Sequence, residues 1–182
     1  MAPVRWLSEP EERAWRGYRR MRTLLDLQIA RDLARDSGLS DSDYDVLSTL
    51  TEAAEPPWRA SALAERLLWS TSRLAHHVGR MERRGLVLRG ECRDDARGAT
   101  VTLTESGCKA LREAAPLHVG SVRAHLIDLL TPKEIETLAT IAAKVLEHLA
   151  ASPTEPEHRP ERRTGPPPGH LHLARPKETG CS

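Results

Sequence analysis

The 182-residue chain contains no phenylalanine, and aromatic residues make up only 3% of it. Its core must therefore be aliphatic, built from Leu, Ala and Val, a composition that suits helices better than a β-sandwich. No stretch approaches the roughly 18 apolar residues of a membrane span, and the N-terminus lacks a long apolar signal region. We expect a cytoplasmic protein without membrane association, consisting of one domain or of one domain with a tail.

Cysteine is also scarce, since Cys92, Cys108 and Cys181 are an odd number at unrelated spacings. They form neither a disulfide framework nor a CxxC metal pair, which favours a reducing compartment. No pattern marks Cys92 or Cys108 as a reactive thiol, and we interpret both as free cysteines with a structural or incidental role. The histidines do not cluster as zinc ligands do, so we predict neither a metal nor a cofactor.

Charged residues are frequent, at 29%, but they nearly balance to a formal net charge of +1. Their distribution is uneven, because residues 59–104 contain nine Arg, no Lys and five Asp or Glu, a local net charge of +4. A modest positive field on one segment suits contact with the phosphates of a nucleic acid. The sequence has no phosphate loop, nucleophile elbow or paired-carboxylate site, so we do not expect an enzyme.

The segment from Ala62 to Thr104 has the pattern of a winged helix-turn-helix. The expected elements are helices at 63–68 and 70–84, a stop at Gly85, strands at 86–89 and 100–103, and a polar loop at 92–98 between them. In such a motif the second helix and the wing can reach two grooves of one duplex. We therefore predict a mainly α protein with a small β-hairpin wing, and double-stranded DNA as its partner.

Further helices are predicted before this segment. One covers about residues 10–36, where apolar side chains recur at helical spacing. Ser40 caps the next helix, with Asp43 three residues on as an acidic variant of the capping box. Ser61 is predicted to cap the first helix of the helix-turn-helix, and either Ser70 or Thr71 the second.

Two helices and a tail follow the wing. The first runs from Thr104 to about 130, and Thr131, Pro132 and Glu134 mark the start of the second. The apolar stripe of this last helix needs a partner, either the first helix together with a second subunit or, as an open alternative, a closed monomeric bundle. Seven of the last 32 residues are Pro, so we expect residues 151–182 to be a disordered tail.

Side chains suited to base edges and phosphates gather at the start and on the outer face of the helix at 70–84. Leu74, Val78 and Met81 share one stripe and should face the core. The remaining positions, which we predict to contact DNA, are Ser70, Thr71, Ser72, Arg73, His76, His77 and Arg80. In the wing we add Arg89, Asp95 and Arg97, with Arg97 at the apex of the hairpin, held by Asp95 and aimed at a minor groove.

The order of elements resembles the MarR family of transcriptional regulators. The motifs that carry the resemblance are Leu63-Ala64-Glu65-Arg66, Ser72-Arg73-Leu74, the run from Val78 to Val87, the wing motif Asp95-Ala96-Arg97-Gly98 and the run from Val101 to Gly107. The resemblance implies a winged-helix domain over 1–150, with a DNA-binding lobe at about 40–104 and dimerisation helices at about 9–37 and 105–150. It also implies a homodimeric repressor of palindromic operators, released by a small aromatic or anionic effector.

An effector site is less clearly marked in the sequence. Rare aromatic and basic side chains, Trp15, Tyr18, Tyr44, His118 and Arg123, could line a pocket for a flat acidic molecule, or could simply fill the core and an interface. Two alternative functions stay open at this point. One is a cysteine-based, redox-responsive regulator of the same fold, and the other is a winged helix that binds a protein instead of DNA.

Overall fold

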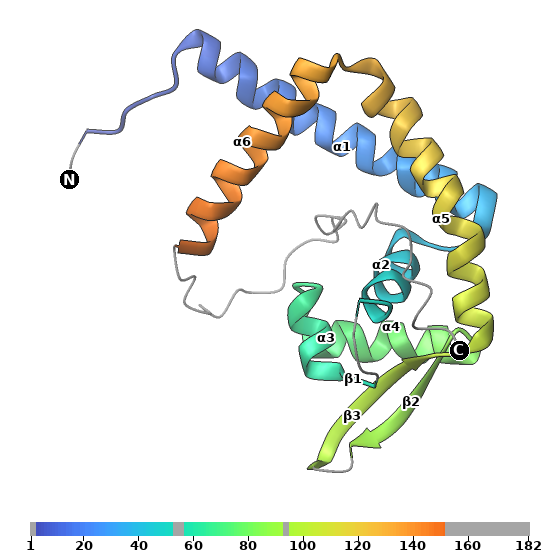
Figure 1. The fold of residues 1–182 in the computed structure, drawn as a ribbon. Helices are drawn as coiled ribbons and strands as arrows, with labels where there is room; N and C mark the ends of the chain where they lie inside the picture. Colours follow the sequence, from blue (N-terminus) through green and yellow to red (C-terminus); the bar gives the residue numbers. More distant parts are fainter. Residues whose placement is uncertain (1–2, 53–56, 93–94, 152–182) are drawn as a thin grey trace. The chain divides into compact units, whose positions relative to one another are not determined.

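The computed structural model describes residues 3–52, 57–92 and 95–151, and the side chains of residues 91–98 lie outside that description. The elements are α1 (Glu9–Ser37), α2 (Asp41–Leu50), β1 (Trp58–Arg59), α3 (Ala60–Arg66), α4 (Thr71–Arg83), β2 (Val87–Cys92), β3 (Asp95–Leu103), α5 (Glu105–His125), the 3₁₀ turn η1 (Ile127–Leu129) and α6 (Pro132–Ala151). Figure 1 shows a mainly helical chain with one long hairpin. The predicted fold class is confirmed, whereas the predicted tail at 151–182 lies outside the described residues beyond Ala151.

Most helices begin where side chains satisfy their first free N–H groups. Ser40 Oγ accepts from Asp43 N at 3.1 Å and Asp43 Oδ2 accepts from Ser40 N at 2.9 Å, which confirms the predicted capping box of α2. Ser70 Oγ accepts from Arg73 N at 3.2 Å, so Ser70 caps α4 as predicted. The prediction for Ser61 is wrong, because α3 already begins at Ala60, directly after the short strand β1.

The three strands form one antiparallel sheet in the order β1–β3–β2. Val87 pairs with Leu103 at one end and Cys92 pairs with Asp95 at the other, with an irregularity after Glu91. The strands therefore extend far into the predicted loop. The expected placement of Arg97 at the apex is wrong, since its backbone belongs to β3 and the hairpin turns between Cys92 and Asp95.

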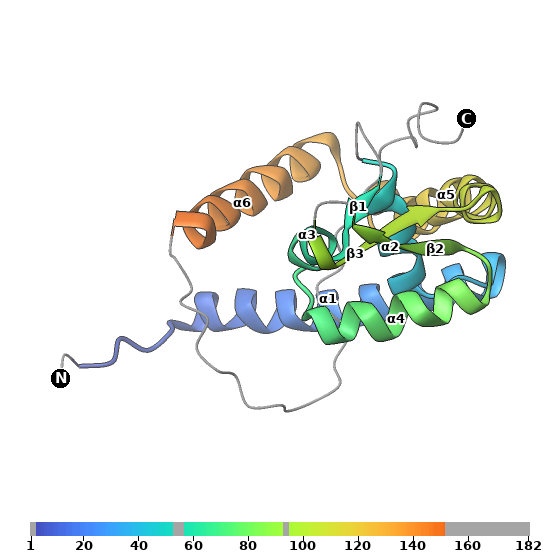
Figure 2. The ribbon, with the colours of Figure 1, turned by 90° about the horizontal axis from the view of Figure 1, so that it is seen from below.

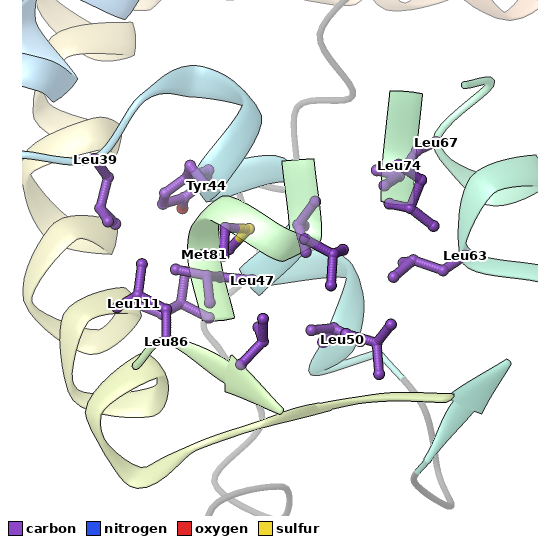
Figure 3. Close-up of a cluster of buried hydrophobic side chains, with 14 of the residues drawn as sticks. Leu39, Tyr44, Leu47, Leu50, Leu63, Leu67, Leu74, Met81, Leu86 and Leu111 are labelled. Atoms are coloured by element: carbon purple, nitrogen blue, oxygen red, sulfur yellow. The ribbon is translucent and has the colours of Figure 1, made fainter. Parts of the chain in front are cut away.

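The sheet and helices α2 to α5 enclose an aliphatic core (Figure 3). Leu47 of α2, Leu63 of α3, Leu74 and Met81 of α4, and Val87 of β2 are each at most 1% exposed. Burying a side chain of this kind stabilises the fold by roughly 1.5–3 kcal/mol. The stripe predicted on α4 thus fixes which face of that helix is left at the surface of the lobe.

A tight joint connects the end of α4 with the start of α5. Thr104 N donates to Leu86 O at 3.3 Å, and Thr104 Oγ1 donates to Gly85 O at 2.6 Å. A Cβ on Gly107 would lie 2.0 Å from Leu86 O, so only glycine fits this position. The first turn of α5 therefore rests directly on the backbone that follows α4.

The described residues divide within α5 into two compact units, one reaching to Ser121 and the other beginning at Val122. In the second unit, α6 starts with the predicted Thr131–Glu134 box, in which Thr131 N donates to Glu134 Oε2 at 2.8 Å. No residue of α6 is buried. None of the helices that the structure describes is long and apolar enough to cross a membrane.

Candidate nucleic-acid interface

The outer face of α4 is exposed along the whole helix (Figure 2). Its exposed polar side chains before Glu82 are Ser70, Thr71, Ser72, Arg73, His76 and Arg80. The first carboxylate along this helix is Glu82, which is half-buried and accepts a hydrogen bond from Arg89 N at 3.2 Å. The face therefore presents hydroxyl groups, an imidazole and two guanidinium groups without a competing acid.

His77 does not belong to this face, and its predicted outward placement is wrong. Its side chain is 5% exposed and lies among the apolar residues that α4 turns inward. The ring meets the Trp69 ring edge-on, with centroids 5.5 Å apart. His77 is three residues after Leu74 and four before Met81, so its position in the helical repeat indicated the core while its polar character suggested the surface.

The two ring nitrogens of His77 have different partners. Nδ1 lies 2.6 Å from Arg80 Nη2, and because a guanidinium can only donate, Nδ1 must accept and carries no proton. Nε2 lies 3.1 Å from Asp43 Oδ1, within ion-pair distance but short of regular hydrogen-bond geometry. A ring tautomer with its proton on Nε2 therefore fits both neighbours.

Asp43 connects α2 with the inner side and the end of α4. Its carboxylate is buried and lies 2.6 Å from Arg84 Nη1, while Arg84 Nη2 donates to Gly38 O at 3.2 Å. Burial alone would raise the pKa of Asp43, but the contacts with His77, Arg84 and Ser40 outweigh it and hold the pKa below its ordinary value. The charged carboxylate thus fastens α4 to the first turn of α2.

Arg73 lies over a tryptophan ring, with its Cζ 4.1 Å from the centroid of the Trp69 ring. Trp69 is 7% exposed and lies in the turn between α3 and α4. On the neighbouring helix α2, burial and the charge of Asp41 raise the pKa of Asp45 to about 7, and the attraction of Arg73 opposes this shift. Arg73 therefore contacts an aromatic ring, and its charge favours the ionised form of a carboxyl group on the neighbouring helix.

A hollow of about 330 Å³ separates α4 from the sheet. Its polar lining comes from Arg59, Ser61, Thr71 and Arg89, from the start of α3, the start of α4 and the wing. Hydroxyl and guanidinium donors around an open hollow are suited to an anionic group such as a phosphate. The side chains of Asp95 and Arg97, predicted to belong to the same interface, lie outside the described residues.

The structure brings the predicted effector residues together in two pairs and places Arg123 in the second unit. Tyr44 and His118 are each 4% exposed, with ring centroids 4.4 Å apart, so these two do meet. Trp15 and Tyr18 stack on each other at 6.0 Å on α1, where both are about half exposed. Arg123 belongs to the second unit and pairs with an aspartate of η1.

Cys108 differs from its interpretation as a free cysteine. It is 5% exposed and takes part in a disulfide bond whose other sulfur lies outside the described side chains. Spacing could not reveal this bond, because two thiols far apart in the sequence pair according to the folded backbone.

Four residues that shape this interface escaped the sequence analysis as functional residues: Trp69, Asp43, Asp45 and Arg84. Asp43 was recognised only as part of a cap, and its contact with Arg84 spans 41 residues of sequence. An aromatic residue directly before a helix cap, in a chain with only four tryptophans, was the one local signal that could have singled out Trp69.

Comparison with known proteins gives consistent matches to transcriptional regulators. AbsC, a MarR family transcriptional regulator from Streptomyces coelicolor, is 40% identical, with a TM-score of 0.75, over 82% of this chain and 100% of that one. A second MarR family regulator from the same organism, solved in complex with DNA, is 38% identical, with a TM-score of 0.76, over 83% of this chain and 97% of that one.

A curated relative from Bacillus cereus, described as an uncharacterised HTH-type transcriptional regulator, is 26% identical over 121 residues, 66% of this chain and 79% of its own length. No family model matches the chain. All three of these relatives are transcriptional regulators and not enzymes, and the two structures share the architecture described above over most of its length. The chain belongs to the MarR family of transcriptional regulators.

Proposed function

We propose that this regulator is a sequence-specific, homodimeric binder of double-stranded DNA that represses palindromic operators. The observation that carries the proposal is the exposed face of α4, with its hydroxyl groups, Arg73, His76 and Arg80 and no carboxylate before Glu82. The relative solved in complex with DNA, 38% identical over most of both chains, supports it. In this proposal α4 enters the major groove and the wing residues Arg89, Asp95 and Arg97 lie against the neighbouring backbone or minor groove.

The hollow between α4 and the sheet suits the phosphate backbone between these two contacts. Thr71 and Arg89 come from the predicted set, and Arg59 and Ser61 join them there. Donors from separate elements around one hollow would fix the register of the protein on the duplex without reading its sequence.

The apolar residues on α1 and α6 support a dimer. Trp15, Met21 and Leu24 of α1 are between 45% and 51% exposed, and Ile141 and Leu146 of α6 are 56% and 65% exposed. Apolar side chains spaced along two helices form surfaces that usually serve an interface. A two-fold dimer would place two copies of α4 roughly 34 Å apart, one turn of the duplex.

Selection from a random-sequence duplex library, followed by footprinting at several salt concentrations, tests the proposal. We expect protection of an inverted repeat, with log K falling by about 0.9 for each phosphate contact per decade of salt. Recovery of no preferred sequence would overturn the proposal and favour a winged helix that binds protein. Sedimentation of the unmodified chain and of an Ile141→Glu, Val145→Glu variant tests the dimer, and we expect the variant to sediment as a monomer.

Substitutions test the face itself. Arg73→Ala should weaken binding to the selected duplex by about 5- to 150-fold if Arg73 pairs with a base, and should relax the preference at one position. Arg97→Ala should weaken all duplexes to a similar degree. Arg112→Ala, an exposed arginine of α5, is the matched control and should bind as the unmodified protein does.

Release by a small aromatic or anionic effector is the last part of the proposal. The packed Tyr44–His118 pair favours a ligand with an aromatic ring that displaces or stacks on these side chains. Titration of the protein–duplex complex with benzoate and salicylate tests it, and dissociation by either acid would support it. Dissociation by peroxide that dithiothreitol reverses would instead favour the redox-responsive alternative.

A further inference from the structure

Two exposed arginines of α4, Arg73 and Arg80, contact aromatic rings that are themselves buried. Arg73 lies on the Trp69 ring at 4.1 Å, and Arg80 donates to His77 Nδ1 at 2.6 Å. Trp69 and His77 then touch each other edge to face at 5.5 Å. Within the described part of the chain, the other arginine over a ring is Arg19 on Trp15, far from this face in the sequence.

We propose that Trp69 and His77 are positioning residues that orient Arg73 and Arg80 before DNA arrives. This inference rests on the proposed DNA binding, and it assigns a role to two side chains that cannot themselves reach a base. One predicted DNA contact, His77, thereby acts through its neighbour instead of by direct contact.

The stack on Trp69 restrains Arg73 without using its hydrogen-bond donors. A guanidinium held over a ring face by a cation–π contact makes no hydrogen bond to that ring, so its N–H groups can still donate to a guanine edge. Asp45 of α2 adds an attraction from the neighbouring helix. A side chain with four rotatable bonds is thus ordered in advance, which removes part of the entropy cost of binding.

His77 restrains Arg80 through one lone pair. The ring is held from two other sides, by Asp43 at 3.1 Å from Nε2 and by the Trp69 ring. Because Nδ1 accepts one N–H of Arg80, the other donors of that guanidinium remain available for a phosphate or a base. Asp43 connects His77 with α2. The packing of α2 against α4 therefore sets the direction of the Arg80 side chain.

Spectroscopy of the free protein tests the restraint independently of DNA. In ¹H–¹⁵N spectra of the arginine side chains, we expect the Nε–H of Arg73 to be shifted upfield by the indole ring current. The shift should vanish in Trp69→Leu and persist in part in Trp69→Phe. Arg83, an exposed arginine on the same helix, is the internal reference. An Arg73 signal that does not differ from that of Arg83 would overturn the assignment to Trp69.

A double-mutant cycle tests the consequence for binding, using the duplex selected by the unmodified protein. Trp69→Leu should weaken binding by about 3- to 10-fold when Arg73 is present. In the Arg73→Ala background the same change should have little effect, because there is no longer a guanidinium to position. Equal losses in both backgrounds would show that Trp69 acts through general folding, and would overturn its positioning role.

Two near-isosteric variants separate the nitrogens of His77. His77→Asn places an acceptor oxygen near the position of Nδ1, and His77→Gln keeps a donor near Nε2 but removes the acceptor. We expect His77→Asn to retain most of the affinity and His77→Gln to lose about 3- to 10-fold. Equal affinity of the two variants, at matched thermal stability, would overturn the role of Nδ1. If the library yields no preferred duplex, the proposed function fails, whereas the arginine spectra still decide the stacking.

Discussion

The contact of α2 with α4 and the contact of α2 with α5 each bury a histidine, yet the two surroundings are opposite. His77 in the first faces Asp43 and Arg80, so both of its nitrogens have polar neighbours. His118 in the second packs against the Tyr44 ring, and its Nδ1 is buried without a hydrogen-bond partner. Adjacent residues of α2, one acidic and one aromatic, therefore create one polar and one apolar contact.

The polar contact of α2 with α4 and the apolar contact of α2 with α5 differ in how firmly they fix the two helices. Partners at fixed distances hold α4 in one orientation, as the proposed insertion of this helix into a major groove would require. Burial lowers the pKa of His118, so this imidazole favours its neutral form among its apolar neighbours. The contact of His118 with Tyr44 has no ion pair of the kind that links Asp43 with Arg84 across the other contact.

The largest effect is expected from Asp43→Ala. The change removes the contacts of the buried carboxylate with Arg84, His77 and Ser40 N. Hydrogen bonds to a charged group are worth about 1.5–3 kcal/mol each, so we expect the loss of this set to cost about 3–5 kcal/mol. Chemical denaturation at pH 7 measures the loss. The control is Glu12→Ala, which breaks the exposed pair with Arg16 and should cost less than about 0.5 kcal/mol. A loss of less than about 1 kcal/mol for Asp43→Ala would mean that the polar contact does not hold α2 to α4.

Asp45→Asn should act in the opposite direction and depend on pH. Burial raises the pKa of Asp45 in the folded chain to about 7, above its ordinary value of 3.8, so the folded state binds its proton more tightly between these values. The unmodified protein should therefore lose stability as the pH rises from about 4 to 7, whereas the variant cannot ionise there. At pH 8 the variant should be more stable by roughly 2–4 kcal/mol, and near pH 4 the two should coincide.

Denaturation at pH 4, 6 and 8 checks this prediction. Asp36→Asn, on the exposed end of α1, is the control and should show no gain at pH 8. A gap between Asp45→Asn and the unmodified protein that stays constant over this range would rule out ionisation of Asp45 as its source.

Ser121→Ala tests the polar link at the edge of the apolar contact. Ser121 Oγ donates to the buried Asp32 Oδ2 at 2.8 Å and so connects α5 with α1. Asp32 also contacts Gln28 and Arg35, so the loss should be only about 1 kcal/mol in denaturation experiments. Ser106→Ala, at an exposed position of α5, should be neutral by comparison.

His118→Leu should have the smallest effect. The Nδ1 atom makes no hydrogen bond, so at pH 8 the substitution should change stability by less than about 1 kcal/mol. Because the folded-state pKa lies below 6.5, the neutral ring contributes stability above that pH that is lost on acidification. The variant should consequently lose less stability than the unmodified protein between pH 7 and 5. Parallel loss in both would contradict the lowered pKa.

Local signals predicted the helices well. The capping residues Ser40, Ser70 and Thr131 mark helix starts because a hydroxyl three residues before a free N–H is a local arrangement. The strands were predicted too short, and β1 was missed, because Trp58 and Arg59 form a strand only by pairing with β3. Trp58 pairs with Val101 and Arg59 pairs with Thr100, which are distant in the sequence. A strand of two residues is also too short to show an alternating pattern of apolar side chains.

The sequence predicted which side of α4 is exposed, but it did not predict the buried contacts behind that side. The repeat of Leu74, Val78 and Met81 determined which side of α4 is exposed, and most of the predicted contacts lie there. His77 was assigned wrongly because its partner Asp43 lies 34 positions earlier in the sequence, and only the folded chain brings the two together. For the same reason the buried carboxyl of Asp45 left no signal that distinguishes it from a surface aspartate.

The joint at Gly107 has a mechanical consequence. Leu86 O occupies the space that a side chain at position 107 would need. Thr104 also donates hydrogen bonds to Gly85 O and Leu86 O, so the joint is closely packed. A hinge at this point would have to break two hydrogen bonds or compress a carbonyl against a backbone. We therefore expect the start of α5 and the end of α4 to move together, so that a tilt of one of these helices also tilts the other.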